Sequence, residues 1–156
     1  MPGMDTRHPI TRHALFQDLP DDELERVLPL LRPRCFRRGQ VLFHRGDRTG
    51  EVHFVMAGAV RIHVGEPPAE RVVAYVLPGE SVGELSAVDG LPRSATAVAI
   101  EDVECYSVDA EAFRQFIERA PVACSRLLRL LSARLRRMDE IAAELLYCEP
   151  RVPGEA

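Results

Sequence analysis

The middle of the chain, from residue 34 to residue 108, is a series of short apolar segments separated by Gly, Pro and Asp. Segments of this length are typical of β-strands, and turn residues at this spacing indicate an antiparallel sandwich or barrel. The segments expected to be strands are 35–36, 40–43, 52–56, 59–64, 71–77, 94–100 and 104–108. Residues 65–70 contain two prolines and a glycine, and we expect them to form the tip of a hairpin.

Helical periodicity flanks this region on both sides. Apolar residues at three- and four-residue steps predict helix from His13 to Leu31, with a fresh start at Pro20-Asp21-Asp22-Glu23 and with Pro29 in the last turn of the second helix. The same periodicity predicts helix again over 110–119 and 122–147. The fold class is therefore α+β: an antiparallel, jelly-roll-like β-roll with N-terminal helices and a long C-terminal helix. The expected organisation is a disordered tail at 1–12, one domain at 13–147 (roll at 34–108, C-terminal helices at 110–147) and a tail at 148–156.

The stretch from Gly83 to Thr96 contains the residues best suited to bind a ligand. Arg93 can hold a phosphate through two parallel hydrogen bonds, and the small residues around it leave backbone N–H groups accessible. Gly83 lets the backbone approach a ligand closely, and Glu84 can accept hydrogen bonds from a sugar hydroxyl. An alternative is that Glu84 and Arg93 pair with each other in a purely structural loop.

The sequence Gly83-Glu84-Leu85-Ser86, a short spacer and Pro92-Arg93-Ser94-Ala95-Thr96 resembles the phosphate-binding cassette of cyclic nucleotide-binding domains. The resemblance is essentially gapless from about Phe16 to Leu146. It implies that Glu84 binds the ribose 2′-hydroxyl and Arg93 the cyclic phosphate, and that the cassette contains a short helix. Ser94 and the backbone of Gly83, Leu85 and Ser86 would complete the phosphate site.

The resemblance also implies how the purine base of the nucleotide would be bound. Ser94 after the cassette Arg favours cAMP over cGMP, and Val82 and Val73 are expected to line an apolar base pocket. Arg134 matches the position of an Arg that caps the purine in bacterial channel domains; the alternative is a solvated Arg on an Arg-rich helix. Related transcription regulators place Thr and Ser on this helix against adenine. Met138 and Asp139 stand there instead, which leaves that arrangement in doubt.

The C-terminal helix carries apolar residues in a heptad pattern. The positions are Leu128, Leu131, Leu135, Met138, Ala142 and Leu145. A seam of this length predicts a parallel homodimer, as this helix forms in the regulators that the chain resembles. The alternative is one amphipathic helix packed against its own roll.

The function expected from these features is a sensor that binds a cyclic purine nucleotide and signals through movement of its C-terminal helix. Two alternatives remain: a nucleotide-free interaction module that dimerises through the helix, and the sensor fragment of a transcription regulator. No helix-turn-helix follows Leu146, so we expect no direct contact with nucleic acid and leave a protein effector open.

Several other functions are disfavoured. The formal net charge of −4 offers no general basic surface to nucleic acid, and no apolar run is long enough to span a membrane. The four cysteines are widely spaced, as in a protein of the reducing cytoplasm. His44, His53 and His63 lie on expected strands without an H-x-H pair, so we interpret them as exposed rather than as ligands of a metalloenzyme. We expect no catalysis, no metal and no cofactor beyond the nucleotide ligand.

Overall fold

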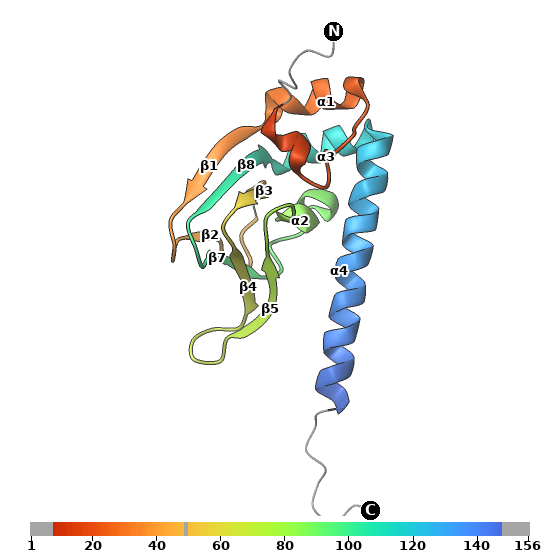
Figure 1. Cartoon of the computed structure of the whole chain (residues 1–156). Helices are drawn as coiled ribbons and strands as arrows, with labels where there is room; N and C mark the ends of the chain where they lie inside the picture. Colours follow the sequence, from red (N-terminus) through yellow and green to blue (C-terminus); the bar gives the residue numbers. More distant parts are fainter. Residues whose placement is uncertain (1–7, 49, 148–156) are drawn as a thin grey trace, which may run out of the picture.

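The computed structural model describes residues 8–48 and 50–147 and shows a β-roll between N-terminal helical segments and a long C-terminal helix (Figure 1). The elements are η1 (Pro9–Arg12), α1 (Asp21–Val27), η2 (Leu28–Leu30), β1 (Arg32–Phe36), β2 (Val41–Phe43), β3 (Glu51–Ala57), β4 (Val60–Val64), β5 (Arg71–Val76), β6 (Ser81–Val82), α2 (Glu84–Asp89), β7 (Thr96–Ala99), β8 (Val103–Asp109), α3 (Ala110–Glu118) and α4 (Pro121–Tyr147). The strands form two four-stranded antiparallel sheets, ordered β1-β8-β3-β6 and β2-β7-β4-β5. The predicted α+β roll is confirmed.

The N-terminal segment agrees with the predicted helix start at Pro20-Asp21, but residues 13–18, also predicted as helix, form turns. Asp18 has φ 55°, a left-handed conformation that an α-helix cannot contain, so the chain turns before α1 begins. α1 starts directly after Pro20, and Pro29 lies in η2, the 3₁₀ turn that follows it. The tail predicted at 1–12 is also wrong where it is described, because η1 is ordered there and Ile10 is fully buried. Residues 1–7 and 148–156 lie outside the described residues.

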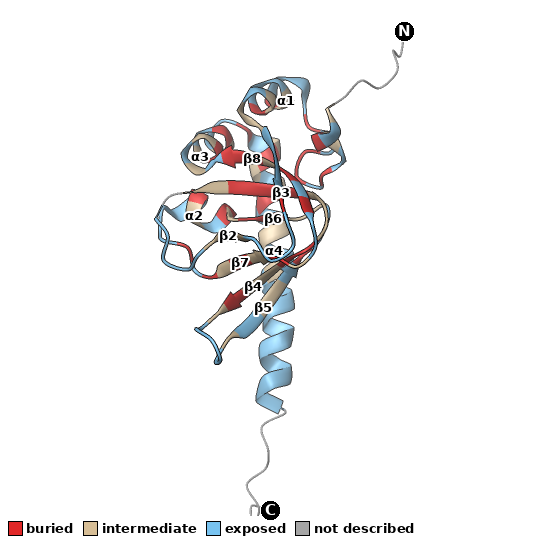
Figure 2. Cartoon of the chain, turned by 90° about the vertical axis from the view of Figure 1, so that its left-hand side faces the viewer, coloured by how far each residue is buried: buried red, intermediate tan, exposed pale blue. Residues whose placement is uncertain are grey.

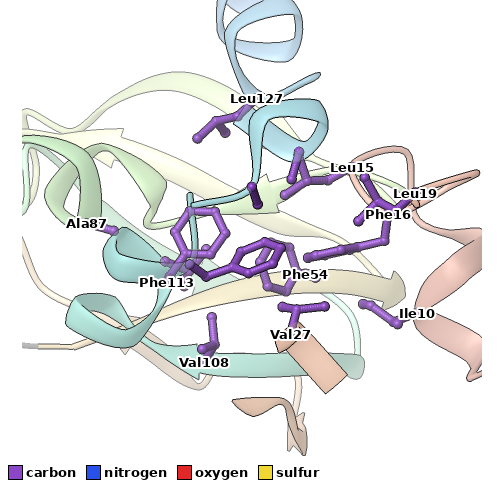
Figure 3. Packing of buried hydrophobic residues seen from close by; sticks show 14 residues of the cluster. Ile10, Leu15, Phe16, Leu19, Val27, Phe54, Ala87, Val108, Phe113 and Leu127 are labelled. Atoms are coloured by element: carbon purple, nitrogen blue, oxygen red, sulfur yellow. The ribbon is translucent and has the colours of Figure 1, made fainter. Parts of the chain in front are cut away.

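β3 separates two hydrophobic clusters. Phe54 points from one face of β3 into the cluster beneath the helices, where its ring meets Phe16 edge-on at 4.8 Å between centroids and Phe113 at 5.7 Å (Figure 3). Val55, the next residue, belongs to the cluster inside the roll, together with Val82. Side chains of a strand alternate between its faces, so both faces of β3 are buried and the strand fixes the roll against the helices.

α4 is attached to the roll mainly through its first half. The Glu23 carboxylate of α1 accepts hydrogen bonds from the first free amides of α4, those of Val122 (3.1 Å) and Ala123 (2.9 Å). Ala123 and Leu127 are buried, whereas residues 135–147 are all exposed, and only the last turns of the helix extend past the sheets (Figure 2). None of the helices in the described ranges is long and apolar enough to span a membrane.

Candidate functional site

The cassette is one of the segments by which the chain crosses from one sheet to the other. β6 belongs to the sheet of β1, β8 and β3, and β7 belongs to the opposite sheet, with Gly83 and α2 between them. Gly83 has φ 94°, and a Cβ atom on it would lie 2.7 Å from both the Glu51 carbonyl oxygen and Arg93 Nη1. Glycine is therefore required here for both backbone conformation and space.

Arg93 lies at the centre of the cassette with only 4% of its surface exposed. Its Nη1 donates to the Gly83 carbonyl at 2.8 Å and its Nη2 to the Glu51 carbonyl at 2.7 Å. Its Cζ lies 4.2 Å from the centroid of the Phe43 ring, a cation–π contact. Its Nε is buried and finds no hydrogen-bond partner among the described residues. The alternative in which Glu84 and Arg93 pair with each other is wrong.

The charge of Arg93 is not neutralised by direct contact. Within residues 8–48 and 50–147, no carboxylate forms an ion pair with its guanidinium, which instead binds the two carbonyl groups. Burial lowers the pKa of the Arg93 guanidinium, and the more distant carboxylates of Asp47, Glu84 and Glu51 oppose this change. A buried cation with an unused N–H donor is suited to an anion that can accept from it.

Glu84, the first residue of α2, is 1% exposed and forms an ion pair with Arg134 of α4 through its Oε1. Arg134 also donates from Nη2 to the Ser81 carbonyl at 2.7 Å. Burial raises the pKa of the Glu84 carboxyl, and the positive charge of Arg134 opposes the rise. The other carboxylate oxygen, Oε2, is buried and has no hydrogen-bond partner in the part of the chain that the structure describes.

A cavity of about 380 Å³ opens between the cassette, the β4–β5 hairpin and α4. All of the candidate residues line it: Val73, Val82, Gly83, Glu84, Leu85, Ser86, Arg93, Ser94 and Arg134. Their roles toward a ligand stay predictions. Arg93 and Glu84 give the cavity a polar end, while Ile62 and Val72 of the hairpin and Ile141 of α4 give it an apolar wall. Both its size and this mixture of walls are typical of small-molecule sites.

The structure adds residues that sequence reasoning missed. Phe43, whose ring faces the Arg93 guanidinium, lines the cavity, and so do Ile141 and Arg137 of α4. Arg137 donates to the Glu80 carboxylate at 3.1 Å, so a second Arg of α4 is tied to the turn before β6. Ile141 lies one turn beyond Met138, but the predicted heptad continues through Ala142, so that pattern did not indicate it. No sequence signal marks the carbonyl groups that hold Arg93.

The strand histidines differ from the prediction that they are exposed. His53 and His63 are buried, and only His44 is exposed. The His53 Nδ1 lies 2.6 Å from the Ser107 hydroxyl, and burial, followed by the charges of Arg34 and Arg93, lowers the pKa of His53 to about 3. The described part of the chain contains no group of three or more His, Cys, Asp or Glu side chains that could hold a metal ion.

A family model described as the cyclic nucleotide-binding domain matches residues 33–120, which are more than half of the chain. The chain belongs to this family. The matched range contains the whole cassette and both sheets except for Arg32, the first residue of β1, and it ends before α4. The wall of the cavity that α4 provides therefore lies outside the match.

Relatives with regulatory names cover most of this chain. The Cyclic AMP receptor protein of Thermus thermophilus is 36% identical over 80% of this chain and 58% of its own length. The CRP-like cAMP-activated global transcriptional regulator of Mycobacterium tuberculosis is 31% identical over 93% of this chain and 64% of its own. The crystal structure of the Thermus thermophilus Catabolite Activator Protein superposes with a TM-score of 0.70 at 34% identity, covering 86% of this chain and 63% of that one. This chain spans less than two thirds of each of them.

Proposed function

We propose that the protein is a sensor for a cyclic purine nucleotide, with cAMP bound more tightly than cGMP. The observation that carries the proposal is the geometry of Arg93. Arg93 lines the cavity, and its guanidinium is buried, forms no ion pair with a carboxylate among the described residues and has an Nε–H without a hydrogen-bond partner there. A cyclic phosphate carries one negative charge and oxygen acceptors, and would satisfy both the charge and the donor.

With the phosphate at Arg93, Glu84 would bind the ribose of the same nucleotide. Its Oε1 is held by Arg134, while Oε2 has no partner and can accept a hydrogen bond from a ribose hydroxyl. The purine base would then extend toward apolar side chains, those of Val73, Val82, Met138 and Ile141. Ser94, which lines the cavity next to Arg93, is the residue behind the preference for cAMP.

Arg134 has a different part in this proposal from the predicted capping of the purine. Its guanidinium is engaged with Glu84 and the Ser81 carbonyl, so stacking on a base would require it to leave both partners. We propose that Arg134 instead connects the ribose-binding carboxylate to α4. Occupation of the cavity would then change how α4 lies against the roll, which provides the signal.

We further propose that a second copy of the chain covers the apolar seam of α4. Three seam residues, Leu128, Leu135 and Leu145, expose between 61% and 68% of their surface. They lie on the helix that forms one wall of the cavity, so a parallel dimer would bring the two sensor sites together across one helix pair. The proposed setting is the cytoplasm, with a protein effector responding to α4.

Calorimetric titration tests the nucleotide proposal. Nucleotide-stripped protein is titrated with cAMP and with cGMP, together with the variants Arg93→Ala and Arg38→Ala; Arg38 is an exposed control. We expect binding of cAMP, weaker binding of cGMP, and a loss of roughly 30-fold or more in Arg93→Ala, because an unpaired buried charge costs about 2–5 kcal/mol. Arg38→Ala should bind as the unchanged chain does. Absence of heat and of any thermal shift with both nucleotides would rule out the proposal.

A further inference from the structure

Gly50, the residue directly before β3, lies against the guanidinium of Arg93. A Cβ atom placed on Gly50 would lie 2.2 Å from Arg93 Nη2, 3.1 Å from Cζ and 3.3 Å from Nε. The guanidinium therefore occupies the space that any other side chain at position 50 would need. Gly50 does not adopt the left-handed conformation that favours glycine, so the requirement at this position is for space.

The position of the guanidinium is limited on its other sides as well. Nη2 is held by the Glu51 carbonyl at 2.7 Å, Nη1 by the Gly83 carbonyl at 2.8 Å, and the Phe43 ring lies 4.2 Å from Cζ. The group is planar and rigid, so pushing Nη2 away from Gly50 also moves Nε, the donor that has no partner. A displacement of one nitrogen thus changes the position of every N–H donor that the guanidinium offers to an anion.

We propose that Gly50 is a positioning residue for phosphate binding, because the absence of its side chain determines where the Arg93 guanidinium can lie. The inference rests on the proposed nucleotide function. Gly50 itself does not line the 380 Å³ cavity; it lines a separate space of about 290 Å³, which Arg93 also borders. A methyl group at position 50 would therefore act on the ligand through Arg93.

The structure distinguishes this role from a requirement of folding. The atom that a Gly50 Cβ would meet first is the tip of a long side chain, which can withdraw while the backbone stays in place. At Gly58, by contrast, the added Cβ would meet the backbone oxygen of Asp102 at 2.2 Å. Substitution at Gly50 should consequently change ligand affinity more than it changes stability.

The test compares Gly50→Ala with two matched variants by titration with cAMP and by thermal unfolding. Gly39→Ala is the control: it introduces a side chain at φ 87°, which is strained, but nothing lies within 4 Å of its Cβ position. Arg93→Lys keeps the charge and removes the Nη2 that meets Gly50. We expect Gly50→Ala to weaken cAMP binding at least tenfold with a melting temperature close to that of the unchanged chain. Gly39→Ala should leave the affinity unchanged.

In the Arg93→Lys background, Gly50→Ala should change the affinity less than twofold, because the atoms that the methyl group displaces are gone. An equal loss in both backgrounds, or an unchanged affinity in Gly50→Ala, would overturn the proposal. The Nε–H resonance of Arg93, assigned by its loss in Arg93→Lys, gives a readout without nucleotide. It should move in Gly50→Ala and not in Gly39→Ala. If the unchanged chain binds no cyclic nucleotide, the proposed function fails, and this resonance alone decides whether Gly50 positions the guanidinium.

Discussion

Removing the Arg134 side chain should leave the Glu84 carboxylate buried without a cation. Glu84 is 1% exposed and has no other charged partner in contact among the described residues. Breaking a buried ion pair from one side costs about 3–5 kcal/mol, and the carboxyl group can limit this cost by taking up a proton. At pH 7 neutralising an ordinary Glu costs about 3.7 kcal/mol, since the pH lies about 2.7 units above its pKa. We expect Arg134→Ala to lower the free energy of unfolding by about 3 kcal/mol at pH 7.

This cost should depend on pH with a definite sign. Burial raises the pKa of Glu84 in the folded chain, so the folded state binds a proton that the unfolded chain releases above the ordinary Glu pKa. The folded state therefore becomes less stable as pH rises through this window, and the destabilisation by Arg134→Ala should shrink to about 1 kcal/mol at pH 5. Urea denaturation of the nucleotide-free protein at both pH values measures the difference.

The Glu84→Gln background is the control. An uncharged amide needs no cation, so Arg134→Ala should cost less than about 1 kcal/mol there, at either pH. A destabilisation that is the same at pH 5 and pH 7, or that persists in full in the Glu84→Gln background, would refute the reasoning. Arg134 would then act through packing of its stem or through its bond to the Ser81 carbonyl.

Three further predictions concern the core, pH and the backbone. Phe54→Ala should lower the free energy of unfolding by about 3–5 kcal/mol in urea denaturation, because the ring is fully buried between aromatic neighbours. A cost near zero would contradict that packing. The pKa of His53 is lowered to about 3, so the unfolded chain binds a proton first as pH falls below about 6.5, and stability should fall by up to about 1.4 kcal/mol per pH unit. His53→Asn should flatten this dependence, and a slope identical to that of the unchanged chain would be inconsistent with a neutral buried His53. Gly58→Ala should cost more than the roughly 1–2 kcal/mol of left-handed strain expected for Gly39→Ala, because its Cβ also meets the Asp102 backbone oxygen. Equal melting temperatures for the two variants would show that the backbone yields there.

The α+β architecture could be predicted because its signals are local. Turn residues divide the middle of the chain into strands, and α4 has no Pro or Gly after Pro121 to interrupt it. The predicted helix start after Pro20 is present, but the prediction of helix from His13 up to that point failed, because the left-handed turn at Asp18 interrupts a stretch whose apolar spacing is still typical of a helix. Ile10 is buried by tertiary packing that its own polar neighbours do not indicate.

The histidines show where strand periodicity is insufficient. Alternation along a strand separates two faces, but it indicates an exposed face only if one side of the sheet meets water. β3 lies between two clusters, so His53 is buried although its neighbours Val52 and Phe54 point the other way. In addition, the pairing of β3 with β8 shifts register between Val55 and Ala57, so the alternation of faces along β3 is not regular to its end.

The candidate site could be located from one segment, but its internal contacts could not. The cassette pattern placed Glu84 and Arg93 correctly within one cavity. The partner of Glu84 lies fifty residues away on a different helix, and its position depends on how α4 packs. Arg93 is held by main-chain oxygens, which every residue carries, so no side-chain pattern can identify them.

The wall that α4 contributes to the cavity affects the apparent affinity of any ligand that binds there. Arg134, Met138 and Ile141 close the cavity from a helix whose second half is fixed to the roll mainly by the bonds of Arg134 and Arg137. A ligand that needs this wall binds only the fraction of molecules in which the helix is docked, and its apparent dissociation constant is the intrinsic one divided by that fraction. If one molecule in ten is docked, the measured affinity is tenfold weaker with every contact unchanged. A substitution at Arg137, which helps to hold α4 through Glu80, can therefore alter the affinity for a ligand in the cavity by changing the docked population.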